Sequence, residues 1–382
     1  MTAQLNITTN ELNNEKERNY GIDALRLLSA IMIVMLHVLS QGGILAASDN
    51  LTYRGEFMWW IQICCLSFVN VFALISGYVG LNSKHKLSNL LNLWLQVFLY
   101  TIISKIVIFS FFEKSFSIVD FCKSFFPVIS SENWYFTAYF VLFFFVPVLN
   151  ELMEKVDVLT IRKCLLFSVF LFMILETLCS IEVFGLRTGY SVLWLVLMYI
   201  VGAYIKKYDP LKHLVAWHCV IGFFSCTILT LLSKILIELV TLHFIGAPAY
   251  GTKFLVYTSP IMVLQAVFGV QLFSKLNIPK SLRKIVLRFA PMTFGVFIIH
   301  TTTAVYRHIL YGAFSFVGDY SWTVLLVVSL TATIGIWFLC SVVDFVRICL
   351  FKLFRIYNFT NWLGVKLESL LNKLNKTKRM EK

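Results

Sequence analysis

Ten apolar segments recur along this chain, and each is long enough to cross the hydrocarbon core of a membrane. They lie near residues 22–40, 57–80, 88–112, 134–151, 164–182, 190–206, 214–241, 253–274, 289–307 and 321–345. A helix needs about 20 residues to span roughly 30 Å of hydrocarbon, and only a helix or a closed barrel satisfies its backbone there. We therefore predict an all-α, polytopic integral membrane protein, a bundle of about ten transmembrane helices.

The composition excludes an ordinary soluble domain. Hydrophobic residues make up 59% of the 382 residues and charged residues only 14%, whereas soluble domains carry about 25% charged residues. The mean hydropathy is +0.79. We assign the net charge of +13 to cytoplasmic loops facing anionic lipid head groups, so membrane lipids are expected partners and nucleic acid is not.

The distribution of Lys and Arg predicts the orientation of the bundle. If the N-terminus lies inside, 24 of the 33 Lys and Arg residues fall in inner tails and loops and 6 in outer loops. Cytoplasmic loops carry this excess of positive charge. We therefore expect both termini in the cytoplasm.

Three regions are expected along the chain. Residues 1–20 form a polar cytoplasmic tail without a cleavable signal peptide, residues 21–345 the ten-helix membrane domain, and residues 346–382 a basic amphipathic tail typical of a helix lying on the inner leaflet. The nine Cys residues include no C-x-x-C pair, so we predict neither a metal site nor a disulfide framework.

The first apolar segment carries three ionisable residues on one face. At 100° per residue, Arg26 and His37 lie about 20° apart around a helix, and Asp23 lies about 60° from Arg26. Ionisable groups are costly in hydrocarbon and mark functional sites by default. With the N-terminus inside, Asp23 and Arg26 lie at the cytoplasmic mouth, and His37 lies about 16 Å deeper.

Each of these residues has a structural and a functional interpretation. Asp23 and Arg26, at i and i+3, either form an ion pair that fixes helix packing or present an Arg that holds an anionic group at the inner face. His37 is either a buried core residue or a general base, the role that imidazole fills near neutral pH.

Further polar groups are expected at the outer surface, near the depth of His37. Glu132, Asn133, Trp134 and Tyr135 open the fourth segment, where the aromatic rings either belong to an interfacial belt or stack on a sugar ring whose hydroxyls Glu132 and Asn133 bind. His300 lies in the outer half of the ninth segment. Residues 257–260, Tyr-Thr-Ser-Pro, add hydroxyls in the eighth segment, where we expect the Pro to break the helix.

Four other charged residues fall inside apolar segments. Lys234 and Glu238, at i and i+4, are predicted to neutralise each other. Lys105 and Glu176 have no partner within their own segments, so each either faces the bundle interior or extends its head group to the membrane surface.

Five stretches, in order along three quarters of the chain, resemble the acyltransferase-3 family of integral membrane O-acyltransferases. They are Tyr-Gly-Ile-Asp-Ala-Leu-Arg at 20–26 followed by His37, Ala-Leu-Ile-Ser-Gly-Tyr-Val-Gly at 73–80, Trp-Tyr-Phe-Thr-Ala-Tyr-Phe at 134–140, Gly-Tyr-Ser-Val-Leu-Trp at 189–194 and Phe-Gly-Val-Phe-Ile-Ile-His at 294–300. The ordered set carries the resemblance, which also implies a ten-helix domain.

The resemblance assigns roles to several residues. His37 matches the essential histidine of the family, Asp23 and Arg26 match its Asp-x-x-Arg element, and Trp134 and His300 match common positions. Many members carry paired arginines in the first cytoplasmic loop for the acyl donor. Here the loop reads Lys84-His85-Lys86, and Lys binds phosphate only as a point charge.

The resemblance implies an O-acetyltransferase of a bacterial cell membrane that acts on a surface polysaccharide. Acetyl-CoA or another acyl-CoA is the expected co-substrate, no cofactor is expected to stay bound, and the acceptor is a glycan or lipid-linked sugar outside the cytoplasm. Arg26, Lys84 and Lys86 would bind the donor; Glu132, Asn133, Trp134, Tyr135 and His300 would bind the acceptor. His37 would act as general base or carry the acyl group itself. A polysaccharide flippase or other transporter is the alternative, and a membrane sensor or scaffold is a third interpretation.

Overall fold

The computed structural model describes residues 18–81, 83–113, 117–179 and 182–380, and this part of the chain is helical without strands. Seven helical stretches are long and apolar enough to cross a membrane. They are α2 (Tyr20–Ser40), α3 (Tyr53–Gly80), α4 (Leu87–Phe111), α6 (Trp134–Lys155), the run Val158–Cys179, α10 (Ala216–Ile245) and α14 (Trp322–Leu353). The prediction of an all-α, multi-pass membrane protein is confirmed.

The run Val158–Cys179 combines three elements: α7 (Val158–Ser168), the π-helix η1 (Val169–Leu175) and α8 (Glu176–Cys179). The other elements are short or lie outside the seven stretches. They are α5 (Ile118–Lys123), η2 (Arg187–Gly189), η3 (Gly251–Phe254), α12 (Lys280–Phe289), η4 (Ala290–Met292), the π-helix η5 (Ala304–Ile309), η6 (Ser315–Val317) and α15 (Ile356–Met380).

Three of the ten expected segments form helices of fewer than 18 residues. These are α9 (Val192–Tyr208, 17 residues), α11 (Pro260–Lys275, 16 residues) and α13 (Thr293–Thr301, 9 residues). A count of ten spans therefore stays a prediction. Our expectation that Pro260 interrupts a helix was wrong: Pro260 is the first residue of α11, a position where the missing N–H costs nothing.

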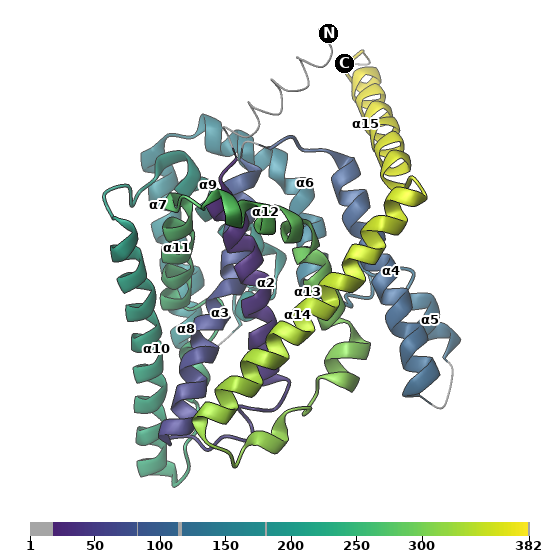
Figure 1. The fold of residues 1–382 in the computed structure, drawn as a ribbon. Helices are drawn as coiled ribbons and strands as arrows, with labels where there is room; N and C mark the ends of the chain where they lie inside the picture. The colour runs from purple at the N-terminus through teal and green to yellow at the C-terminus, as the bar shows by residue number, and fades with distance from the viewer. Residues whose placement is uncertain (1–17, 82, 114–116, 180–181, 381–382) are drawn as a thin grey trace.

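Helices α2 and α3 form the centre of the bundle. In their most apolar stretches 67% of α3 and 61% of α2 is buried, against 11% of Val158–Cys179 and 22% of both α10 and α14. Helix α3 packs against α9, α2 and α11, and α14 crosses α2, as Figure 1 shows. The first residues of α2 and the helix α15 lie at the same end of the bundle.

The three expected regions along the chain stay predictions, and residues 1–17 of the expected N-terminal tail lie outside the described residues. Helix α14 continues past residue 345 to Leu353. The tail helix α15 packs against α4: the Leu87 N–H donates to Glu368 Oε1 at 2.8 Å, and Gly364 lies against Ser88.

Glycine allows a close approach between α3 and α9. A Cβ built on Gly77 would lie 1.9 Å from the Tyr199 carbonyl oxygen of α9, and a Cβ on Gly202 would lie 2.0 Å from the Leu74 carbonyl oxygen of α3. Small residues let membrane helices approach until their backbones touch. This reciprocal contact sets the distance between α3, which contributes to the cavity described below, and α9.

We predict that Gly202→Ala destabilises the protein, because the added methyl forces α9 away from α3. Overpacking of this kind costs about 1–3 kcal/mol, and thermal unfolding in detergent should show a lower midpoint. Gly335→Ala on α14 is the control, since nothing lies within 4 Å of its built Cβ. Equal unfolding temperatures for the two variants would contradict the prediction.

Candidate functional site

A cavity of about 250 Å³ is lined by Ile33 and His37 of the C-terminal half of α2; this end of α2 lies at the end of the bundle opposite α15 (Figure 1). Its walls come from α2, α3, the start of α6, α13, η5 and the segments around residues 190 and 257. Four lining residues were predicted from the sequence: His37, Glu132, Asn133 and Trp134. The fold thus gathers in one cavity residues that lie nearly 100 positions apart in the sequence.

One wall of this cavity includes the imidazole of His37, which pairs with a second, buried imidazole behind it. His37 Nδ1 lies 3.0 Å from His300 Nε2, and His300 Nδ1 lies 2.6 Å from the carbonyl oxygen of Val296, one turn earlier on α13. His300 is buried, whereas His37 is half-buried and lines the cavity. The sequence placed both residues in the outer half of the membrane but gave no sign of their contact.

The hydrogen bonds define which nitrogen carries each proton when both rings are neutral. A carbonyl oxygen only accepts, so His300 Nδ1 carries the hydrogen and donates to Val296. His300 Nε2 is then an acceptor, and His37 Nδ1 donates to it. The remaining nitrogen, His37 Nε2, keeps its lone pair and has no hydrogen-bond partner among the described residues. This arrangement leaves an oriented base at the cavity wall.

Aromatic rings form a second wall. Trp134 packs against Tyr190 with ring centroids 4.6 Å apart and stacks on Tyr257 at 6.3 Å, while the Tyr306 ring meets His37 edge-on at 5.1 Å. Rings with a polar tip offer an apolar face and a hydrogen-bonding group together. The wall suits a ligand with both apolar and hydroxyl surface.

Glu132 and Asn133 already have partners in the protein. Glu132 forms an ion pair with Lys105 of α4 at 3.3 Å and accepts the Thr303 hydroxyl at 3.0 Å. Asn133 caps α6 through the Phe136 N–H and donates to Thr301 at 2.8 Å. Lys105 therefore faces the bundle interior. Glu132 and Asn133 line the cavity. They also connect the start of α6 to the end of α13 and the residues that follow it.

Tyr135 and His300 lie differently from the other predicted acceptor residues. Neither is among the lining residues of the cavity. Tyr135 instead lines an apolar throat, a constriction of about 20 Å³ that it forms with Ile33, Val69, Phe72, Phe294 and Phe297. Ile33, Val69 and Phe297 line both spaces, so the throat adjoins the cavity.

The predicted inner residues lie apart from the cavity. Asp23 pairs with Arg26 at 3.4 Å, as expected from the i, i+3 spacing, and also with Arg18 at 2.6 Å. Lys84 and Lys86 are exposed in the loop between α3 and α4. The structure thus places a cationic group at the N-terminal end of α2 and His37 near its C-terminal end.

Several cavity residues were not singled out as site residues from the sequence. Tyr306 and Arg307 belong to the π-helix η5, and Tyr190 lies just after the 3₁₀ turn η2. The outer loops explain their placement: the Gly312 N–H donates to the Gln41 carbonyl oxygen and the Phe314 N–H to that of Gly42. Hydropathy reports which segments are apolar, but it carries no information on such pairings between loops.

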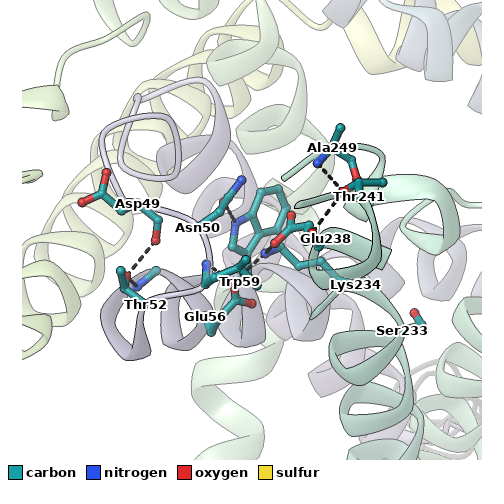
Figure 2. Close-up of polar contacts among 12 residues, drawn as sticks. Asp49, Asn50, Thr52, Glu56, Trp59, Ser233, Lys234, Glu238, Thr241 and Ala249 are labelled. Carbon is teal, nitrogen blue, oxygen red and sulfur yellow. Dashed lines mark hydrogen bonds and ion pairs between the residues drawn. The ribbon is translucent and has the colours of Figure 1, made fainter. Parts of the chain in front are cut away.

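A second polar cluster lies between α3 and α10 and is purely internal. Figure 2 shows Lys234 reaching from α10 toward Glu56 and Trp59 of α3. Its ammonium group lies 2.6 Å from Glu56 and 2.7 Å from Glu238, with the Trp59 ring centroid at 5.1 Å. The predicted pair with Glu238 is present, and the third member Glu56 ties the two helices together. The Lys234 side chain is fully buried, so the cluster holds the outer ends of α3 and α10.

We predict that Lys234→Met strongly destabilises the protein, because it leaves two buried carboxylates without a cation. Breaking a buried pair from one side costs about 3–5 kcal/mol. Lys155→Met is the matched control, since its i, i+4 pair with Glu151 is exposed and such pairs contribute about 0.3–0.5 kcal/mol. Denaturant unfolding in detergent measures both; similar midpoints would refute the assignment.

Comparison with known proteins identifies the family. The family model of the acyltransferase domain, acyltransferase-3, matches residues 19–342, a range that includes the cavity, the throat and the Asp23–Arg26 pair. The chain therefore belongs to the acyltransferase-3 family, whose members are membrane acyltransferases. No curated protein and no solved structure matches the chain.

Proposed function

We propose that this protein transfers an acyl group, acetyl by analogy with its family, from cytosolic acyl-CoA to a hydroxyl of a glycan outside the cytoplasm. The observation that carries the proposal is His37, which His300 orients through Nδ1 and which lines a cavity near the C-terminal end of α2. A sugar hydroxyl has too high a pKa to attack a thioester unaided, and a positioned imidazole supplies the missing base.

The acceptor would occupy the cavity. Trp134 and the tyrosines offer faces on which a sugar ring stacks, and Glu132 and Asn133 offer polar atoms for its hydroxyls. His300 would act through His37 rather than on the acceptor, because its second nitrogen bonds to the Val296 carbonyl. We therefore assign His300 a positioning role.

The donor would enter from the opposite end. Arg26, with Lys84 and Lys86 of the neighbouring loop, would hold CoA phosphates at the inner mouth as charged hydrogen-bond donors. The pantetheine arm would pass through the apolar throat and bring the thioester to His37. In the chemical step His37 Nε2 takes the hydroxyl proton and the sugar oxygen bonds to the carbonyl carbon. The C–S bond then breaks, and the CoA sulfur leaves as the thiol after taking the proton from His37.

This layout suits the cell membrane of a bacterium, where acyl-CoA and surface glycan lie on opposite sides. A flippase or transporter would move its substrate without acylating it. The structural feature that favours transfer is a single base fixed by a hydrogen-bond chain, which transport does not need.

We predict that His37→Ala inserts and folds normally but leaves glycan O-acetylation at background. Loss of a general base typically costs about 10²–10⁴ in rate. NMR of the surface glycan before and after mild alkali compares cells with the wild type, His37→Ala or no protein. His308→Ala, an exposed histidine of η5, should retain acetylation. Unchanged acetylation in cells without the protein would refute an acetyl transfer to this glycan.

We predict that His300→Ala lowers the rate about 100-fold or more, since an unsupported base loses its tautomer and orientation. His300→Gln, whose amide oxygen can accept the His37 Nδ1–H, should recover part of the loss. Acetyl transfer in membranes at saturating acetyl-CoA measures both variants. Equal rates for the Ala and Gln variants would show that His300 only fills space.

A further inference from the structure

A second, larger cavity lies beside the first and is not used by the proposed reaction. It measures about 710 Å³ and opens between α8, the loop at 182–188, the outer part of α10 and the segment 250–258. Its lining is rich in hydroxyl groups, with two glutamates, Glu176 and Glu182. The hydroxyl-bearing threonines are Thr177, Thr188, Thr241, Thr252 and Thr258.

Three buried polar side chains of this cavity have atoms without partners. Within the described residues, Glu176 Oε2, Thr177 Oγ1 and Thr258 Oγ1 form no hydrogen bond, although these residues are only 8%, 5% and 0% exposed. Thr241 of the same cavity, by contrast, accepts the Ala249 N–H and donates to a backbone carbonyl. Buried polar atoms without partners cost free energy, so each one in a native structure needs an explanation.

The backbone next to Glu176 forms a π-helix, as it also does at the first cavity. The π-helix η1 ends at Leu175 and places Glu176 at the start of α8. The other π-helix of the described chain, η5, supplies Tyr306 and Arg307 to the cavity of His37. Single π-turns inside helices occur mostly at functional sites.

The two cavities are lined by neighbouring residues of the same two chain segments. Tyr257 lines the His37 cavity, while its neighbours Val256 and Thr258 line the second. In the same way, Tyr190 lines the His37 cavity and Thr188 lines the second. The rings of Tyr190 and Tyr257 lie 5.0 Å apart, and their hydroxyls are 3.4 Å apart. A ligand that occupies both cavities would pass at this hydroxyl contact, so the Tyr190 and Tyr257 side chains would separate to admit it.

We propose that the second cavity is a subsite for a neighbouring sugar unit of an oligomeric glycan acceptor, bound while the hydroxyl to be acylated lies at His37. This inference rests on the proposed function. Hydroxyls of an uncharged sugar both donate to Glu176 and accept from Thr177 and Thr258, which satisfies the unpartnered atoms. Lys253 also lines this cavity, but the two glutamates outnumber it, so a sugar or lipid head group bearing phosphate or carboxylate is disfavoured at this position.

The test compares acceptors of different length. Unacylated surface glycan from cells lacking the protein is cleaved into single-sugar and multi-sugar fragments, and acetyl transfer to each is measured with purified protein in nanodiscs. Glu176→Gln together with Thr258→Val should raise KM for the multi-sugar fragment about tenfold and leave KM for the single sugar unchanged. Thr331→Val, at an exposed hydroxyl of α14 that bonds only within its helix, is the control. Equal changes for both fragments, or none, would overturn the subsite.

A binding measurement separates this inference from the proposed reaction. The fluorescently labelled multi-sugar fragment is titrated against His37→Ala protein with and without Glu176→Gln and Thr258→Val. Weaker binding in the combined variant supports the subsite even if the wild type transfers no acetyl group, in which case only the proposed reaction fails. Unaltered affinity, or no binding at all, overturns the subsite whether or not transfer occurs.

Discussion

The arrangement of this bundle depends on the cost of leaving a charge unpaired in hydrocarbon. Asp344 illustrates it on α14: its Oδ1 accepts from Gln96 and Tyr100 of α4 at 2.8 and 2.7 Å, and Arg347 binds both carboxylate oxygens. A Cβ on Gly295 would lie 2.1 Å from the Asp344 carboxyl carbon, so α13 packs directly on this group. One carboxylate thereby fixes α4, α13 and α14 together, and α13 is the helix that carries His300.

The sequence predicted those parts of the structure that depend on local spacing. Apolar length identified the membrane helices, and the i, i+3 and i, i+4 spacings identified Asp23–Arg26 and Lys234–Glu238. The contact of Lys105 with Glu132, by contrast, crosses from α4 to the start of α6, and the outer segments after α13 complete the cavity. Such contacts depend on how helices pack and how outer loops pair, which the periodicity of one segment does not encode.

The C-terminal boundary shows the same limit. Net charge placed Arg347 in a basic cytoplasmic tail, but the structure buries it beside Asp344 within α14. A hydropathy profile registers two charged residues as the end of a span, although together they form an internal ion pair. Likewise, the motif at 294–300 pointed to His300 as a site residue, but only the contact with His37 indicates a positioning role.

In the proposed reaction the histidine pair orients the base without burying a charge in the membrane. A base that is oriented by a carboxylate, as in soluble hydrolases, would need a further cation in this part of the membrane. His300 orients His37 as a neutral group, and His300 is itself held by its hydrogen bond to the Val296 carbonyl oxygen, so no net charge is buried. The narrow throat beside Ile33 and Phe297 is apolar, so in the proposed reaction it would leave little room for water between donor and base. The residues that make His37 reactive and those that keep the membrane closed are therefore neighbours on the same helices, α2 and α13.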